Sequence, residues 1–129
     1  MKITQFTDFS LRLLLYLARH RDRVCTVREV AEFYCISAEH LKKIVRRLSE
    51  LGYIQTVRGK HGGLRLAREP SEINLGRLMR EEENLQLLPC SEGASQDCPI
   101  PDCKLRGAVD RALSAFLAVL DKETLADLV

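Results

Sequence analysis

The chain has 129 residues, of which 46% are hydrophobic and 29% charged, with a formal net charge of +2. This length and composition are ordinary for one globular domain, residues 1–129, large enough to bury a hydrophobic core. The longest apolar run, Leu13 to Ala18, is far too short to span a bilayer, and no secretory signal opens the chain. We therefore expect a cytoplasmic protein without a membrane partner.

The two halves of the chain carry opposite charge. Residues 1–68 hold 14 Lys and Arg against 6 Asp and Glu, a net of +8, whereas residues 69–129 hold 6 against 12, a net of −6. Such a division is typical of a protein whose basic half meets a polyanion, above all nucleic acid. The alternative is a surface on which charge is segregated by chance.

The first predicted helix covers residues 7–19. Phe9, Leu13 and Leu17 recur at helical spacing, and further leucines widen the apolar face, which predicts burial against more than one neighbour. Thr7 is the expected N-cap, and Asp8 in the first turn suits the helix dipole.

Two short helices follow and predict a helix-turn-helix at about residues 28–51. Thr26 and Glu29 have the spacing of a capping box at the start of the first of them. After a turn at residues 35–37, Ser37 can cap a basic helix over residues 38–51, which Gly52 ends. Two helices joined by a turn of three or four residues, the second one basic, are typical of DNA-binding proteins.

A hairpin comes directly after the basic helix. Residues 53–58 and 64–67 read as strands, and the glycine-rich tip at 59–63 carries cations. This order predicts a wing, so the fold class is mainly α: a winged helix-turn-helix, with its DNA-binding part at residues 1–70, a two-stranded wing and a long C-terminal dimerisation helix. A nucleotide cradle is disfavoured because no GxxxxGK[ST] pattern is present.

The residues expected to contact DNA lie on the helix-turn-helix and the wing. The start of the basic helix would approach bases, its Lys and Arg side chains would bind phosphates, and the wing glycines would allow close approach of the backbone. They are Arg28, Ser37, Ala38, Glu39, His40, Lys42, Lys43, Arg46, Arg47, Arg58, Lys60, His61, Gly62 and Gly63.

The acidic half begins with a short helix at 75–83, whose residues 81–83, all glutamate, are expected to form a solvated turn. A longer helix over residues 104–120 carries an apolar stripe. This stripe could pack on its own domain, but we expect a homodimer interface, because winged helices usually pair to read two half-sites. Its residues are Leu105, Val109, Ala112, Leu113, Phe116 and Leu120. Residues 124–129 are expected to form a short helix or a frayed end.

Three of the five cysteines, Cys90, Cys98 and Cys103, fall in an irregular segment at residues 89–103. Convergent thiols predict a metal or cluster site, a zinc site, a thiol redox switch or a disulfide framework, and a cytoplasmic setting favours metal. Cys25 and Cys35 are expected to be small, partly buried residues instead. No GxSxG or HExxH motif is present and the histidines are scattered, so an enzyme is not expected.

Several motifs together resemble the nitric-oxide-sensing repressors among the bacterial winged-helix iron–sulfur transcription regulators. They are residues 7–12, the helix-turn-helix, residues 57–66, the three cysteines and residues 124–129, so the resemblance covers essentially the whole chain. It implies a homodimer on a palindromic double-stranded operator. It also implies that Cys90, Cys98 and Cys103 bind an iron–sulfur cluster, 4Fe-4S in preference to 2Fe-2S, with Asp8 of the partner subunit as fourth ligand.

The resemblance further implies a repressor that releases its operator when nitric oxide nitrosylates the cluster, which derepresses nitric-oxide detoxification genes. The gaps of seven and four residues between the cysteines are less even than in the family, and Asp8 could serve only as a first-turn charge. Alternatives are a regulator of cluster supply, iron or redox state, a zinc or thiol-based regulator, and, from another class, an electron-transfer or cluster-carrier protein.

Overall fold

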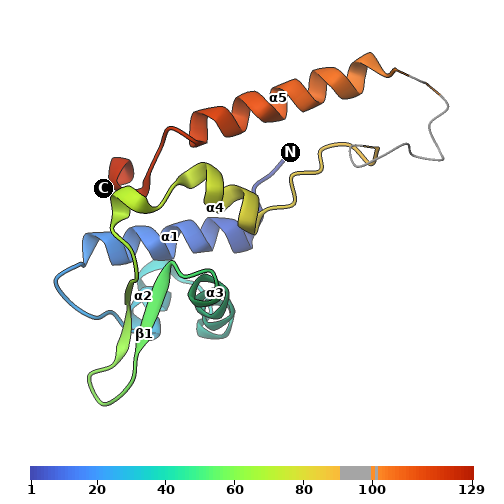
Figure 1. The fold of residues 1–129 in the computed structure, drawn as a ribbon. Helices are drawn as coiled ribbons and strands as arrows, with labels where there is room; N and C mark the ends of the chain where they lie inside the picture. The colour runs from blue at the N-terminus through green and yellow to red at the C-terminus, as the bar shows by residue number, and fades with distance from the viewer. Residues whose placement is uncertain (91–99, 101) are drawn as a thin grey trace.

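The computed structural model describes residues 1–90, 100 and 102–129, and shows a helical protein with one small sheet (Figure 1). Helix α1 (Gln5–Arg19) lies in the middle. Helices α2 (Val27–Tyr34) and α3 (Ala38–Glu50) lie on one side of it together with the hairpin. Helix α5 (Lys104–Leu120) lies on the opposite side, with α4 (Leu75–Glu82) between. The predicted fold class is confirmed.

Helices α2 and α3 begin where their caps predict. The Thr26 hydroxyl accepts from Glu29 N, and the Glu29 carboxylate accepts from Thr26 N, which is the expected capping box. The Ser37 hydroxyl accepts from His40 N, and the chain leaves α3 through Gly52 at a φ of 81°. The apolar side chains of these helices meet those of α1 in a core that includes Leu13, Leu14, Leu17, Val30, Leu41, Ile44 and Leu48.

The expected cap of the first helix is wrong. Helix α1 starts at Gln5, and Thr4 is its N-cap, whose hydroxyl accepts from Thr7 N. Thr7 itself is fully buried, and its hydroxyl donates to the carboxylate of Glu83 at 2.5 Å. Both threonines are good N-cap residues. Both hydroxyls also donate to the Glu83 carboxylate, and Thr4 is the one that lies directly before the first helical residue.

Strands β1 (Ile54–Val57) and β2 (Gly63–Leu66) form the antiparallel wing, with Ile54 opposite Leu66 and Val57 opposite Gly63. An isolated bridge between Cys25 and Leu64 attaches the hairpin to the segment before α2. A Cβ at Gly63 would lie 2.3 Å from the Cys25 carbonyl oxygen, so a side chain there would break this bridge. The wing is therefore anchored at its base.

The C-terminal part closes over α4. The 3-10 turn η1 (Pro70–Glu72) leads into α4, and the 3-10 turn η2 (Leu125–Leu128) ends the chain. Leu125 is fully buried, and Leu125 N donates to Ile73 O at 2.9 Å. Of the two expectations for residues 124–129, the short helix is the one observed. No helix among the described residues is long and apolar enough to cross a membrane.

Candidate DNA-binding surface and sensor segment

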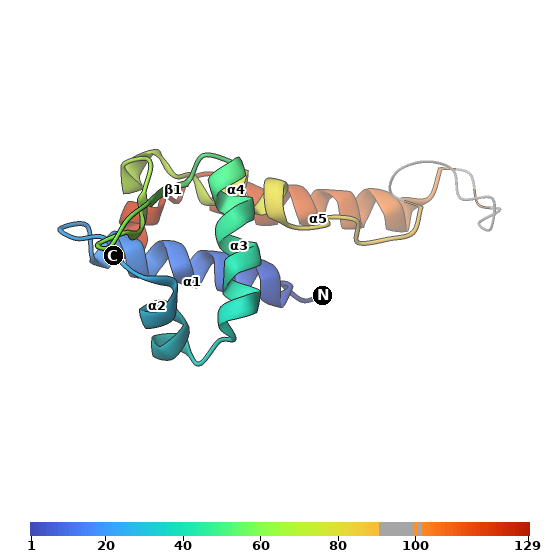
Figure 2. The same cartoon turned by 90° about the horizontal axis from the view of Figure 1, so that it is seen from below.

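The predicted DNA-binding helix α3 is exposed along its length on the face opposite α5, and the wing projects from the same side (Figures 1 and 2). Ala38 and Glu39 are solvent-exposed at its start. His40 is different, because its ring packs edge-on against Phe9 at 5.3 Å between centroids and lies near Phe6. The His40 side chain, which the sequence predicted to contact DNA, thus packs the start of α3 against α1.

The cations on this face differ in their availability. Lys43, Arg58 and Lys60 are exposed and form no ion pair within the part of the chain that the structure describes. Lys42 pairs with Glu39 at 3.1 Å, Arg46 with Glu50 at 3.3 Å and Arg28 with Glu32 at 3.0 Å, all on the surface. Exposed pairs are worth little, about 1 kcal/mol or less, so a phosphate can replace the carboxylate.

Arg47 differs from these cations, because its carboxylate partner is buried. Its Nε lies 3.4 Å from a carboxylate oxygen of Glu82, whose side chain is 0% exposed, and its Nη2 donates to the Glu81 carbonyl oxygen at 3.2 Å. Arg47 was expected to be a phosphate ligand like its neighbours. The structure places it against the end of α4.

The expected solvated turn at residues 81–83 is wrong, because all three glutamates contact other elements of the fold. Glu81 accepts from the Tyr53 hydroxyl at the start of the wing, and Glu82 accepts from the Ser10 hydroxyl at 3.2 Å. Glu83 accepts from Thr4 and Thr7 of α1. Burial raises the pKa of Glu82 despite its contacts with Ser10 and Arg47. The acidic run therefore joins α4 to α1, α3 and β1.

Asp8, the predicted fourth cluster ligand, lies in the first turns of α1 with 41% of its side chain exposed. It pairs with Arg12 one turn later at 3.0 Å. The Arg12 guanidinium also lies over the rings of Phe9 and Tyr34, at 6.0 and 5.8 Å from their centroids. Because Tyr34 belongs to α2, Arg12 links Asp8 to the helix-turn-helix.

Cys90 and Cys103 are free, partly exposed thiols on either side of residues 91–99 and 101. Cys98 lies outside the described residues. No group of three metal-ligating side chains occurs among the residues that are described. Thiolates are the ligands that iron–sulfur clusters prefer, and these two thiols are free to supply them.

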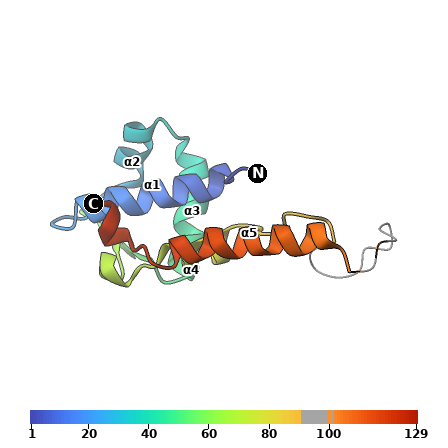
Figure 3. The ribbon, with the colours of Figure 1, turned by 90° about the horizontal axis from the view of Figure 1, so that it is seen from above.

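Figures 2 and 3 show that the Cys103 end of α5 extends away from α1 and the helix-turn-helix. Cys103 is the N-cap of α5, whereas Asp8 lies in the first turn of α1.

The two remaining cysteines behave differently from each other. Cys25 is fully buried beneath the wing, and burial raises the pKa of its thiol. Cys35 is exposed at the end of α2, with a φ of 54°. The expectation of partial burial is thus wrong for both. The left-handed backbone conformation of Cys35, between α2 and α3, was not predicted, because cysteine is not a residue type typical of that conformation.

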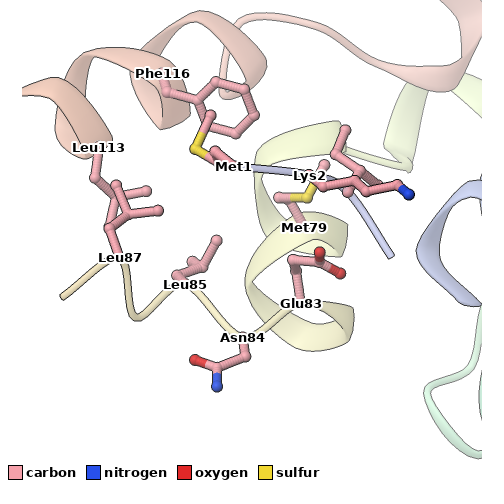
Figure 4. Close-up of a pocket in the computed structure, with 10 residues that line it drawn as sticks. Met1, Lys2, Met79, Glu83, Asn84, Leu85, Leu87, Leu113 and Phe116 are labelled. Atoms are coloured by element: carbon pink, nitrogen blue, oxygen red, sulfur yellow. The ribbon is translucent and has the colours of Figure 1, made fainter. Parts of the chain in front are cut away.

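The apolar stripe of α5 is half-buried or exposed at every residue predicted for it. Leu117 is the one residue of α5 that is buried, whereas Leu105 is 63% exposed. Leu113 and Phe116 line a cavity of about 180 Å³ against the N-terminal arm and the chain that follows α4 (Figure 4). Its other lining residues include Met1, Ile3, Met79, Leu85 and Leu87.

A basic recognition helix and an anchored wing on one face, with a long uncovered helix on the other, define a winged-helix DNA-binding regulator. Comparison with known families agrees: Rrf2, described as an iron-dependent transcriptional regulator, matches residues 3–129. The chain belongs to the Rrf2 family. It is accordingly a transcriptional regulator and not an enzyme.

Relatives and solved structures support this assignment. The HTH-type transcriptional regulator NsrR of Bacillus subtilis is 44% identical over 100% of this chain and 90% of its own length. NsrR of Shouchella clausii is 45% identical over 100% and 89%. The resemblance to this group is confirmed.

Among solved structures, CymR, the global cysteine regulator of B. subtilis, matches with a TM-score of 0.80 and 27% identity, over 99% of this chain and 95% of its own. IscR of T. potens has a TM-score of 0.82 at 24% identity, over 99% and 85%, and supports the fold.

Proposed function

We propose that this chain is a homodimeric repressor that senses nitric oxide through an iron–sulfur cluster, 4Fe-4S in preference to 2Fe-2S. The observation that carries the proposal is a pair of free thiols, Cys90 and Cys103, at the ends of the segment between α4 and α5, in a chain similar to NsrR throughout its length. Cys98 supplies the third thiolate. The resemblance supplies the signal, nitric oxide.

Asp8 of the partner subunit completes the site in this proposal. Its carboxylate is accessible, and its ion pair with Arg12 is exposed enough to be exchanged for another cation. A bound cluster supplies iron that nitric oxide can attack, and a carboxylate ligand leaves one iron more labile than a thiolate would.

When Asp8 leaves the site, it is free to pair with Arg12, which lies over Tyr34 of α2. The contact at the cluster and the geometry of the helix-turn-helix are thereby coupled. Cluster state biases the dimer between a DNA-binding and a released arrangement.

The DNA-bound dimer would place α3 of each subunit in successive major grooves of a palindrome. Lys43 and the wing cations Arg58 and Lys60 are exposed without carboxylate partners among the described residues, so they can bind phosphates directly. Ala38 and Glu39 lie at the helix start that approaches base edges.

The test uses protein purified without oxygen, with the cluster reconstituted. Affinity for a palindromic promoter duplex is measured by fluorescence anisotropy for the holo-protein, the apo-protein and the nitric-oxide-treated holo-protein. We expect tight binding only for the untreated holo-protein. Equal affinity in the three states would refute the proposal.

Cys90→Ser and Cys35→Ser form a matched pair for this test, because both thiols are free but only Cys90 belongs to the proposed site. We expect Cys90→Ser to lose cluster absorbance and promoter binding, and Cys35→Ser to retain both. Zinc in place of iron in the purified protein would favour a zinc regulator instead.

A further inference from the structure

Glu82 is a buried carboxylate at the last residue of α4. Its side chain is 0% exposed, and one oxygen accepts from the Ser10 hydroxyl at 3.2 Å. The other oxygen accepts no hydrogen bond from any described residue, and the Arg47 Nε lies 3.4 Å from it. Burying a charged group with incomplete partners costs free energy, so an interaction must compensate here.

Arg47 is held from two sides of the same helix end. Its Nε faces the Glu82 carboxylate, and its Nη2 donates to the Glu81 carbonyl oxygen at 3.2 Å. Since Arg47 remains 43% exposed, the rest of its guanidinium fork can reach a ligand outside the protein. Its neighbour Arg46 pairs instead with the exposed Glu50 of its own helix.

We infer that Glu82 is a positioning residue for operator binding: it aims Arg47 of the recognition helix at a DNA phosphate and fixes α3 to the end of α4. The inference rests on the proposed DNA-reading role of α3. It extends that role to a buried residue of the acidic half, eight residues before Cys90.

The direction in which Glu82→Gln changes DNA affinity distinguishes a positioning role from a purely electrostatic effect of the carboxylate. Glu82→Gln removes a negative charge close to the DNA-binding surface, which by electrostatics alone would raise affinity for any DNA. If Glu82 positions Arg47, the same substitution lowers affinity for the operator, because Arg47 is no longer aimed. The two effects have opposite directions.

Glu82→Gln is also the substitution that the fold should tolerate. The exposed part of Arg47 can be solvated when its partner becomes neutral, whereas loss of Arg47 would leave Glu82 buried without a cation. The matched control is Glu50→Gln. It also removes a carboxylate from an ion pair with an arginine of α3, but this pair lies on the surface.

The experiment measures binding of reconstituted holo-protein to the palindromic duplex and to a scrambled duplex over a range of salt concentrations. For Glu82→Gln we expect about tenfold weaker operator binding, as loss of one charge-assisted contact implies. Its dependence on salt should correspond to about one phosphate contact fewer per subunit. We expect cluster absorbance to be unchanged, and Glu50→Gln to bind no more weakly than the wild type.

Arg47→Lys provides the second variant, because it keeps the positive charge and loses the fork. We expect it to weaken operator binding about as much as Glu82→Gln, with the double variant little weaker than either, since both remove one contact. If Glu82→Gln does not fold, the operator affinity and the salt dependence of Arg47→Lys decide whether the held guanidinium binds a phosphate.

Unchanged or stronger operator binding by Glu82→Gln, strictly additive losses in the double variant, or loss of the cluster would each overturn the inference. Normal operator binding by Arg47→Lys would do so too. Failure of the wild-type holo-protein to prefer the palindrome would instead contradict the proposed function. In that case the ratio of wild-type to Glu82→Gln affinity on the scrambled duplex still decides whether Arg47 is positioned.

Discussion

Single side chains account for most of the differences between sequence pattern and structure. Three consecutive glutamates look like a solvated turn, yet successive residues on a helix point about 100° apart and so reach different neighbours. Here those neighbours are Tyr53, Arg47 with Ser10, and the threonines of α1. Burial and the contact with Glu81 raise the pKa of Tyr53, which therefore remains a neutral hydrogen-bond donor.

Glu29 gives a prediction at this scale. Its contact with Arg23, and then the Thr26 N–H and the Tyr16 hydroxyl, lower its pKa to about 2. Its folded-state pKa is depressed, so its stabilisation is complete above pH 4.5, the ordinary pKa, and is lost as the pH falls towards 2. We expect Glu29→Gln to lower the free energy of unfolding by about 1 kcal/mol near pH 6, as loss of a cap does.

Urea unfolding of the apo-protein at pH 6 and pH 3 checks this expectation. The gap between wild type and Glu29→Gln should narrow at pH 3, because the wild-type carboxylate has begun to lose its advantage. Glu32→Gln, in an exposed pair with Arg28, is the control and should show little effect at either pH. A gap of the same size at both pH values would contradict the pKa assignment.

The bounds of helices and strands were predicted from the sequence more accurately than the contacts of single side chains. Capping residues and apolar spacing predicted α2, α3 and α5 within about two residues, and the glycine-rich tip predicted the hairpin. These signals are local, so they need no knowledge of the tertiary fold. How closely elements approach one another is not local.

Gly76 tests the contact between α4 and the end of α5. A Cβ there would lie 1.9 Å from Asp121 Oδ1 and 2.9 Å from Asp121 N. It would displace the carboxylate that pairs with Arg80. Alanine improves helix propensity by about 1 kcal/mol, but overpacking costs about 1–3 kcal/mol, so we expect Gly76→Ala to be net destabilising.

The control is Gly107→Ala in α5, where the nearest atom is the flexible end of Arg111 at 3.4 Å. Propensity should dominate there, with stabilisation of about 0.5–1 kcal/mol. Thermal unfolding of both variants measures the difference. Equal shifts of the melting temperature in the same direction would show that Gly76 does not mark a close approach.

The whole molecule has two distinct faces. Helix α3 and the wing face away from α5, whose Cys103 end extends beyond α1 and the helix-turn-helix (Figure 3). Leu105 at this end is exposed, as expected of a helix that packs against a second copy. In the proposed dimer, this geometry lets the cysteines of one subunit meet Asp8 of the partner subunit.

Mixed dimers test that arrangement. Asp8→Ala subunits combined with Cys103→Ser subunits contain one complete site if the aspartate comes from the partner, and none if it comes from the same chain. We expect the mixture, but neither variant alone, to recover a wild-type cluster spectrum together with its response to nitric oxide. Absorbance and circular dichroism of the reconstituted protein provide the measurement.

A mixture that behaves as the sum of its two parents would remove Asp8 of the partner subunit from the site. Combining Glu123→Ala with Cys103→Ser subunits is the control, because Glu123 is a carboxylate outside the proposed site. In that mixture, complete cluster sites should form only on the cysteines of the Glu123→Ala subunits, because these subunits keep Cys103.

The sequence alone determined the order of elements, the basic reading half, the three cysteines of the candidate site and the resemblance to a family, because caps, periodicity and motifs act over a few residues. The tertiary structure alone decided that Thr7 is buried against Glu83, that His40 packs against Phe9, and that Glu82 is buried beside Arg47. These contacts join residues that are distant in the chain, so their energies depend on which elements pack together and cannot be read from local spacing.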